Sequence, residues 1–294
     1  MKRVKRKVGV GFSPLLFGFS FWLFCAFLPL TIPASGQRVA VLTPDHAETS
    51  RSFAETIGAR LAEKLTVLDA SLSETAYSSA SLAAPFNLSV DESKKIGSAI
   101  GCDALILVRA ATQRRSAFGR SEYYEAYAVI YVVSSRTGRL AHWKLQTVEA
   151  ASPDKAVREL TVSIPALATE ITNAVRTAIQ HELAESAPAE MEELPDDGSP
   201  AAKTFRAPIP YRRLKPEYTL QASLYDVTAT VEITVDLDEK GMILRTEVVR
   251  WAGFGLDQSV EKAVRAMNWR PAERNGKPLP MRFLLRYNFK KIEK

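Results

Sequence analysis

The residue types that most often carry metal or nucleophilic chemistry are few and scattered in this chain of 294 residues. The three histidines (His46, His142, His181) and two cysteines (Cys25, Cys102) show no metal-ligand spacing. Neither G-x-G-x-x-G nor G-x-x-x-x-G-K-[ST] follows an expected strand, which argues against a nucleotide site. No carboxylate pair and no Ser/His/Asp set stands out. The sequence therefore predicts no catalytic residue, no metal, no cofactor and no enzyme.

The most unusual stretch is "NWRPAERNGKPLP", residues 268–280, which holds one Trp, three cations and three prolines. Interleaved cations and aromatic residues suit a nucleic-acid clamp, and a polar loop can also carry catalysis. A connector is the third interpretation, because Pro271 stops a helix and Asn275-Gly276 tolerates the positive φ of a tight turn. Pro278 then delays pairing, since it lacks an N–H. The flanking elements decide among the three.

Charge is uneven along this chain, which is long enough for two domains. Residues 1–36 carry five cations and no acid, residues 37–202 carry 16 cations and 22 acids, and residues 203–294 carry 18 cations and 11 acids. A basic C-terminal region can meet nucleic acid or an anionic surface. We interpret its Lys and Arg as solvated side chains at strand edges and turns, and expect no nucleic-acid partner.

Residues 1–36 have the pattern of a signal peptide or a membrane anchor. A basic cluster precedes an apolar run from about Phe12 to Ile32, which holds the start of the chain in the cytoplasm. Ala34 and Gly36 are small residues suited to a signal-peptidase cut after Gly36. The run is also long enough to cross a bilayer uncleaved, with residues 8–33 in contact with the membrane. Both alternatives export the rest of the chain to the cell envelope.

Residues 37–183 alternate strand and helix patterns and predict an α/β domain with a mixed sheet. Ser89 and Glu92 form the capping box of one helix, and Gly101 ends it. Residues 114–124, "RRSAFGRSEYY", mix cations with aromatic residues, and we expect a solvated loop there rather than a single-strand binder. The expected elements are a strand at 38–42, helices at 49–65 and 89–101, a connector at 69–87, a strand at 102–112, a hairpin at 123–146, and an amphipathic stretch at 152–183 interrupted near Pro165.

The junction "IGSAIGCDALILVRA", followed by a hairpin that ends in "RTGRL", resembles the envelope domain shared by TolB amino-terminal domains and curli-assembly lipoproteins. This resemblance covers residues 37–150 and implies a protein-interaction module. The next segment, residues 184–210, holds six acids before its first cation and five prolines. We therefore expect an extended acidic linker between two domains.

Residues 211–294 predict a small α+β domain, in which two helices cover a three-stranded antiparallel sheet. Apolar and polar residues alternate along 228–237, as in a strand with one buried face. The expected elements are an entry segment with a short helix at 211–226, strands at 228–237 and 242–251 joined by "DEKG", a helix at 256–267 and a last strand at 281–289.

Four motifs, "KPEYTLQA", "VEITVDLDEKGMI", "GLDQSVEKAV" and "NWRPAERNGKPLP", precede the last strand in an order that resembles the TonB C-terminal domain. Thr219, Ala229 and Arg270 depart from that family's pattern, which usually has Pro, Gly and an aromatic residue at these places. The matching residues are Pro216 and Tyr218 of the entry motif, and Gly241, Leu256, Asp257, Trp269, Pro271, Ala272, Asn275, Gly276 and Pro278 of the structural motif.

Members of that family grip outer-membrane transporters by adding the transporter's N-terminal peptide to the free edge of their last strand. The resemblance implies the same β-augmentation here, in which unpaired main-chain groups supply affinity and alternate side chains supply specificity. The alternative is a strand that only completes the sheet, and Tyr218 likewise either meets the partner or packs on the sheet. The candidate docking edge consists of Met281, Arg282, Phe283, Leu284, Leu285, Arg286, Tyr287, Asn288 and Phe289.

Two functions remain open, both in the envelope of a Gram-negative-type bacterium. One is a periplasmic scaffold, soluble or tethered to the inner membrane, that binds other envelope proteins. The alternative is an energy transducer that couples an inner-membrane proton-driven motor to outer-membrane transport. The apolar run has no ionisable residue, and a short linker with a folded domain replaces the long spacer usual in transducers. Both features favour the scaffold.

Overall fold

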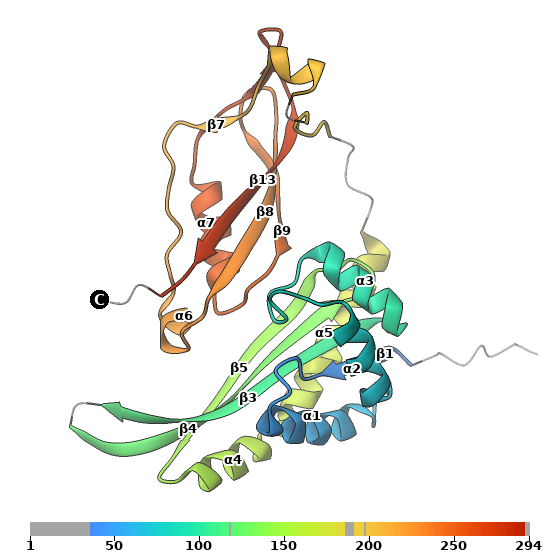
Figure 1. The fold of residues 1–294 in the computed structure, drawn as a ribbon, viewed down its shortest axis with the longest axis vertical. Helices are drawn as coiled ribbons and strands as arrows, with labels where there is room; N and C mark the ends of the chain where they lie inside the picture. The colour runs from blue at the N-terminus through green and yellow to red at the C-terminus, as the bar shows by residue number, and fades with distance from the viewer. Residues whose placement is uncertain (1–35, 118, 186–190, 197, 292–294) are drawn as a thin grey trace, which may run out of the picture. The chain divides into compact units, whose positions relative to one another are not determined.

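A five-stranded mixed sheet with strand order β2-β1-β3-β4-β5 lies in the first half of the chain, residues 36–185 (Figure 1). The computed structural model describes residues 36–117, 119–185, 191–196 and 198–291. Strand β1 runs parallel to β2 and β3, whereas β3, β4 and β5 pair antiparallel. The predicted α/β mixed sheet is confirmed. Its strands are β1 (Arg38–Leu42), β2 (Thr66–Val67), β3 (Ala104–Ala117), β4 (Arg120–Ser134) and β5 (Leu140–Ala150).

Capping residues set where several helices of this half begin and end. Ser89 and Glu92 form the predicted capping box, and Gly101 ends that helix in the left-handed conformation with φ 77°. The expected connector at 69–87 is partly wrong, because Asp69 caps a helix by accepting a hydrogen bond from the N–H of Leu72. That helix buries few residues, so its sequence shows little apolar periodicity. The helices are α1 (Glu48–Leu61), α2 (Ala70–Ser79), α3 (Val90–Ile100), α4 (Pro153–Val162) and α5 (Ile164–Ala184).

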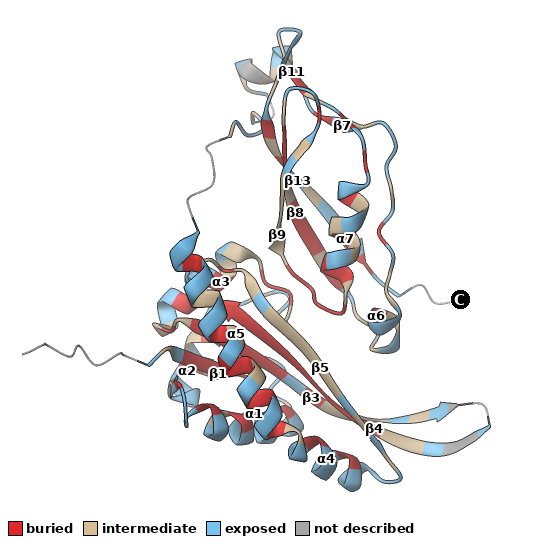
Figure 2. Cartoon of the chain, turned by 180° about the vertical axis from the view of Figure 1, so that it is seen from behind, coloured by how far each residue is buried: buried red, intermediate tan, exposed pale blue. Residues whose placement is uncertain are grey.

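Both faces of β4 are buried from residue 126 to residue 133, which explains the continuous apolar sequence there (Figure 2). Ala128, Ile130 and Val132 belong to the core cluster under α1, α4 and α5. Tyr127 and Tyr131 belong to a second cluster on the opposite face, which includes residues of α2, α3 and the C-terminal half. A sheet with two apolar faces must be packed against other elements on each face. On the face that carries Tyr127 and Tyr131, residues of the C-terminal half (198–291) form part of this packing.

The segment 114–124 forms the distal part of a long β3–β4 hairpin rather than the expected loop. Cross-strand pairs continue to Ala117 opposite Arg120, and Gly119 turns the chain with φ 74°. Oppositely charged side chains meet diagonally across the strands, as in the ion pair between Arg115 and Glu125 at 2.7 Å. Such pairs stabilise strands whose composition lacks an apolar alternation.

The C-terminal half contains a three-stranded antiparallel sheet in the order β13-β8-β9. Val231, Ile233 and Val235 of β8 are fully buried beneath α7, as the alternation predicted. The α+β arrangement with two helices is confirmed. Its elements are α6 (Leu220–Leu224), β8 (Ala229–Leu237), β9 (Ile243–Arg250), α7 (Leu256–Arg265) and β13 (Met281–Phe289).

The stretch 268–280 is a connector, and it contains short β-strands that form main-chain pairs. Asn275 and Gly276, with φ 53° and 76°, form a two-residue turn between short strands. The expectation that Pro278 delays pairing is wrong, since it lies opposite Glu273. In a two-residue hairpin this second pair is not hydrogen-bonded, so the missing N–H faces away from the partner. The strands are β10 (Trp269–Arg270), β11 (Ala272–Arg274) and β12 (Lys277–Leu279).

Residues 200–210, in the segment expected to be an extended linker, pair with this connector. The 3-10 helix η1 (Pro200–Thr204) leads into β6 (Phe205–Arg206), which pairs with β11, and β7 (Ile209–Pro210) pairs with β10. By its contacts, the chain from Gly36 onward makes up one compact unit. None of the described helices is long and apolar enough to span a membrane. The apolar run before Ile32 lies outside the described residues.

Candidate partner-docking edge

Strand β13 is an edge of the C-terminal sheet, where it pairs with β8 alone among the named strands. The N–H of Arg282 points away from β8 and donates to the carbonyl oxygen of Glu192 at 2.8 Å. Backbone groups of a strand alternate between its two sides. Leu284, Arg286 and Asn288 therefore also direct their N–H and C=O groups toward the open side.

The other five predicted edge residues face inward. Their main-chain groups pair with β8, and their side chains lie on the apolar face, with Met281 and Phe283 buried in the core. Burial also raises the pKa of the Tyr287 hydroxyl above its ordinary value. Only four of the nine residues can thus offer main-chain bonds to a partner strand. Whether a partner uses them stays a prediction.

The two entry-motif residues pack within the domain. Pro216 is buried, and the ring of Tyr218 stacks on Phe289 with centroids 6.3 Å apart. The Tyr218 hydroxyl donates toward the carbonyl oxygens of Ala222 and Val227, at 3.0 and 2.8 Å. These contacts match the packing alternative for Tyr218. They hold the entry segment against the end of β13.

The structural-motif residues also have packing roles. Trp269 is 4% exposed and meets Phe283 edge to face, with ring centroids 5.0 Å apart. Gly241 has φ 80°, and a Cβ there would overlap the carbonyl of Trp269. Leu256 and Ala272 lie in the core. The motif therefore supports β13 from its apolar side.

Asp257 holds the loop that precedes its own helix. Its carboxylate accepts hydrogen bonds from the N–H groups of Ala252 and Gly253, at 2.8 and 2.9 Å. Burial raises the pKa of Asp257 to about 6, although these two hydrogen bonds act in the opposite direction. In the same loop, Trp251 packs on Tyr131 of the first half with ring centroids 5.3 Å apart. A family-motif residue thus secures a contact between the two halves.

Ion pairs cover the polar face of the C-terminal sheet. Arg282 makes two hydrogen bonds to the carboxylate of Asp236, both 2.7 Å, and these raise the pKa of its guanidinium. Glu232 accepts from Arg286 at 2.6 Å and from Arg250 at 3.2 Å. Asp236 and Glu232 are buried, so these partners compensate for their removal from water. The arrangement places arginines along β13, at the docking edge.

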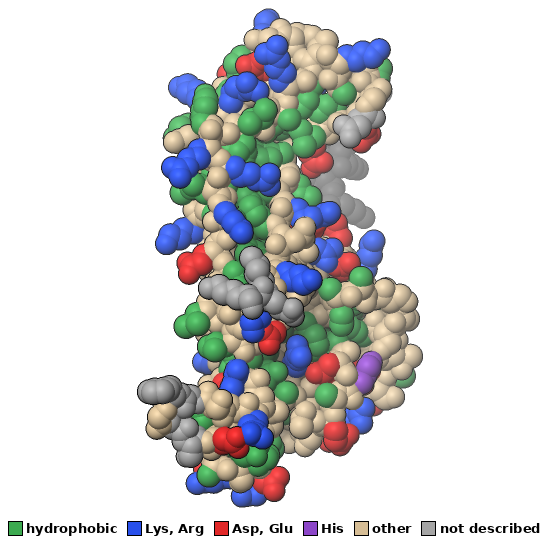
Figure 3. All heavy atoms as spheres, turned by 60° about the vertical axis from the view of Figure 1, so that its left-hand side comes forward, with side chains coloured by type: hydrophobic (Ala, Val, Ile, Leu, Met, Phe, Trp, Pro, Cys, Tyr) green, Lys and Arg blue, Asp and Glu red, His purple; other side chains and the backbone are tan. Residues whose placement is uncertain are grey.

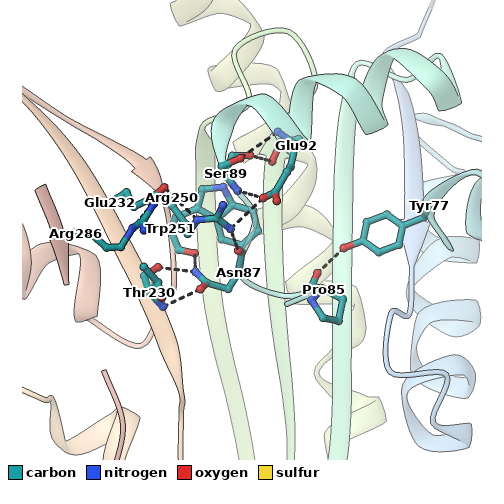
Figure 4. Close-up of polar contacts among 11 residues, drawn as sticks. Tyr77, Pro85, Asn87, Ser89, Glu92, Thr230, Glu232, Arg250, Trp251 and Arg286 are labelled. Atoms are coloured by element: carbon teal, nitrogen blue, oxygen red, sulfur yellow. Dashed lines mark hydrogen bonds and ion pairs between the residues drawn. The ribbon is translucent and has the colours of Figure 1, made fainter. Parts of the chain in front are cut away.

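Residues of the first half reach this polar face (Figure 4). The side-chain amide of Asn87 donates to the carbonyl oxygens of Thr230 and Trp251, at 2.9 and 2.6 Å, and its oxygen accepts from the N–H of Thr230. Arg250 donates to Glu92 at 3.0 Å. Burial opposes ionisation of Glu92, but hydrogen bonds from Ser89 and the charge of Arg250 together lower its pKa.

These contacts cover the second edge of the sheet at one end. Ser89 forms an antiparallel bridge with Arg250, and the N–H of Trp251 donates to the carbonyl oxygen of Leu88 at 3.3 Å. The end of β9 therefore meets the first half of the chain. Strand β13 is likewise covered at one end only, at Arg282.

Sequence reasoning missed Asn87, Glu92 and Arg250 as parts of this arrangement. Asn87 lies in a stretch without periodicity, and no local signal links it to Thr230. The acids on β8 did offer a signal, because an antiparallel pairing of 228–237 with 281–289 sets them opposite arginines. Arg274, expected to be solvated, instead forms an ion pair with Glu192.

Residues 215–290 match the family model of the Gram-negative bacterial TonB protein C-terminal. The chain therefore carries a TonB C-terminal domain, as the four motifs indicated. The match covers that domain and does not extend into the first half. Comparison with curated proteins found no match.

Several solved structures are similar to parts of the chain. Lipoprotein GNA1162 from Neisseria meningitidis is 16% identical, with 47% of this chain and 99% of that chain covered and a TM-score of 0.33. The TonB C-terminal domain from Pseudomonas aeruginosa is 20% identical over 36% of this chain and 98% of that one, with a TM-score of 0.27. The protein CT253 from Chlamydia trachomatis is 12% identical over 49% and 96%, with a TM-score of 0.30.

Proposed function

We propose that this protein is a non-enzymatic scaffold of the Gram-negative cell envelope, which docks a protein partner by strand addition to β13. One observation carries the proposal: three consecutive outward positions of β13, Leu284, Arg286 and Asn288, have no bridge to a strand other than β8 among the described residues. The match of residues 215–290 to the TonB C-terminal family model supports an envelope role for this edge. Main-chain bonds along an edge give affinity for an extended peptide of a partner, such as the N-terminal peptide of an outer-membrane transporter.

A second candidate function follows from the same family match. A TonB-type energy transducer would use this edge as well, but it would also need to keep residues 1–36 as an anchor at its motor. The two functions share the docking step and differ in the fate of the N-terminal segment.

Substitution of Leu284 by Pro tests the docking step. Leu284 directs its N–H outward and its side chain is about half exposed, so Pro removes a bond to a partner and none to β8. We expect the partner captured by the full chain from envelope extract, identified by mass spectrometry, to be lost at least about tenfold, the equivalent of one hydrogen bond of about 1.4 kcal/mol.

Leu284→Ala is the matched control, because it removes the same side chain and keeps the N–H. It should retain the partner, and thermal unfolding should show that both variants are folded. Leu285→Pro removes an inward N–H and should instead destabilise the sheet. Equal capture by Leu284→Pro and Leu284→Ala would contradict docking at this edge.

A further inference from the structure

The chain already places one of its own segments on the docking edge. The carbonyl oxygen of Glu192 accepts the outward N–H of Arg282, and Glu193 forms a parallel bridge with the same residue. The carboxylate of Glu192 also pairs with Arg274 on β11. Residues 192–194, the cis segment, thus imitate the first residues of an added strand.

The cis segment covers only the beginning of the edge. Its single bridge is at Arg282, and Pro195, which follows Leu194, has no N–H to extend a ladder. The outward positions of Leu284, Arg286 and Asn288 have no such bridge among the described residues. One bridge and an exposed ion pair are weak compared with a full strand. A longer strand can therefore displace the cis segment.

Charge favours an acidic occupant. Residues 274–291 contain six cations and no acid, and Figure 3 shows Lys and Arg side chains spread over the C-terminal half. Arg282 already pairs with Asp236 of β8, so its charge is partly neutralised. The side chain of Arg286 is 63% exposed although it pairs with Glu232. The cis segment carries Glu192 and Glu193, and Asp196 follows shortly after. An edge rich in cations attracts extended chains of opposite charge.

Space beside the edge is available for side chains. A cavity of about 500 Å³ lies between the polar face of the sheet and the start of α3. Leu284 and Arg286 line it from β13, Val90 and Asp91 from α3, and Leu194 from the cis segment. Alternate side chains of an added strand would point toward this cavity, because they fall on the polar face of the sheet.

We propose that the cis segment is an internal competitor for the β13 edge, and that the partner docks there through an acidic extended segment running parallel to β13. This inference rests on the proposed docking function and adds the chemistry of the partner and a mechanism of control. The edge is closed at Arg282 in the free chain and opens fully when a stronger acidic strand replaces residues 192–194.

Charge reversal in the cis segment tests the competition without any partner. In E192K/E193K, Lys replaces the acid that pairs with Arg274 and the acid whose charge acts on Arg282, so the segment should leave the edge. The N–H of Arg282 should then exchange with deuterium at least about tenfold faster, because it loses its acceptor. The control E48K/E55K changes the net charge equally on α1, where both side chains are exposed. Unchanged exchange at Arg282 in E192K/E193K would overturn the inference.

A synthetic peptide tests the partner chemistry. Fluorescein-labelled EMEELVD, the sequence of residues 190–196 with Val in place of Pro195 so that main-chain pairing can continue past Arg282, is titrated against the full chain and followed by anisotropy. We expect binding at least about tenfold tighter to E192K/E193K than to the wild type or E48K/E55K, weaker in high salt, and absent when Leu284→Pro is added. The lysine version KMKKLVK should not bind.

Two outcomes of the titration would overturn the inference. One is equal affinity of the acidic peptide for the wild type and E192K/E193K, and the other is binding that survives Leu284→Pro. Failure of the proposed docking function would look different. No partner would be captured from envelope extract, but deuterium exchange at the N–H of Arg282 and the affinity for the acidic peptide would still increase in E192K/E193K.

Discussion

Asp257 illustrates, at the scale of single residues, how a motif residue can serve the fold. Both of its carboxylate oxygens accept main-chain N–H groups, in a buried position next to the loop that touches Tyr131. Burial makes ionisation costly there, and the pKa rises from 3.8 to about 6. The residue therefore binds a proton more tightly in the folded chain than in the unfolded chain.

This pKa predicts a pH dependence of stability. Because the folded state holds the proton more tightly, the contribution of Asp257 to the free energy of unfolding is largest at low pH and falls as pH rises from 3.8 to about 6. Asp257→Asn should abolish that fall. At pH 7.5 it should cost about 1–3 kcal/mol, since Asn accepts through one oxygen and leaves a buried N–H unpaired.

Urea unfolding of both chains between pH 4 and pH 7.5 measures the effect. The difference between wild type and Asp257→Asn isolates this residue from carboxyls such as Glu92, whose lowered pKa acts with the opposite sign. A difference that does not vary with pH would contradict the raised pKa.

At the scale of elements, loop 251–255 between β9 and α7 fits closely against the first half. Gly253 has φ 73°, and a Cβ there would overlap the indole of Trp143. Phe254 packs on the same indole with ring centroids 5.0 Å apart. The turn at Gly276 has a similar φ of 76°, but open space surrounds it. Two glycines of similar φ thus differ in the space that surrounds them.

Ala substitutions at the two glycines separate the backbone strain of a positive φ from the steric overlap of a Cβ with its neighbours. Gly276→Ala should cost about 1–2 kcal/mol, the price of a left-handed conformation for a residue with a Cβ. Gly253→Ala should cost at least about 1 kcal/mol more, because the loop or Trp143 must move as well. Thermal unfolding of the two variants, with tryptophan fluorescence, makes the comparison. Equal destabilisation would mean that the loop adapts without strain.

At the scale of the whole molecule, the described residues from Gly36 onward form one compact unit, in which the TonB C-terminal domain shares a core cluster with the first half. Ion pairs add to this contact. Arg139, just before β5, pairs with Glu247 of β9, and Glu185, just after α5, pairs with Arg245 of β9. A partner docked at β13 would therefore bind a domain that is already packed against the first half of the chain. Such an arrangement suits a scaffold protein, in which both halves are held together when a partner binds.

The N-terminus separates the two candidate functions. We expect mass spectrometry of the mature protein to find Gln37 as its first residue, because small residues precede that position after a basic and apolar leader. Such a cut excludes energy transduction by a single chain. A mature protein that keeps Met1 and the apolar run would instead support the transducer and contradict this prediction.

Local patterns in the sequence were sufficient for most elements and for the family. The alternation in 228–237, the capping box at Ser89 and the Asn275-Gly276 turn each involve neighbours within a few residues, so the sequence itself reveals them. They predicted β8, the start of α3 and the connector before β13. The sequence did not predict the helix at 70–79 or the long hairpin at 114–124. The helix buries few side chains, and the hairpin is held by cross-strand ion pairs, so neither shows a periodic pattern of apolar residues.

What the sequence by itself determined is a mixed α/β half, a TonB C-terminal domain and a last strand at 281–289. The tertiary structure alone decided which main-chain groups of that strand face outward, that Asn87 joins Thr230 and Trp251, and that Glu192 and Glu193 rest on Arg282. The physical reason is distance along the chain. These contacts link residues about 90 to 160 positions apart, and such pairings depend on the packing of whole sheets rather than on any local preference.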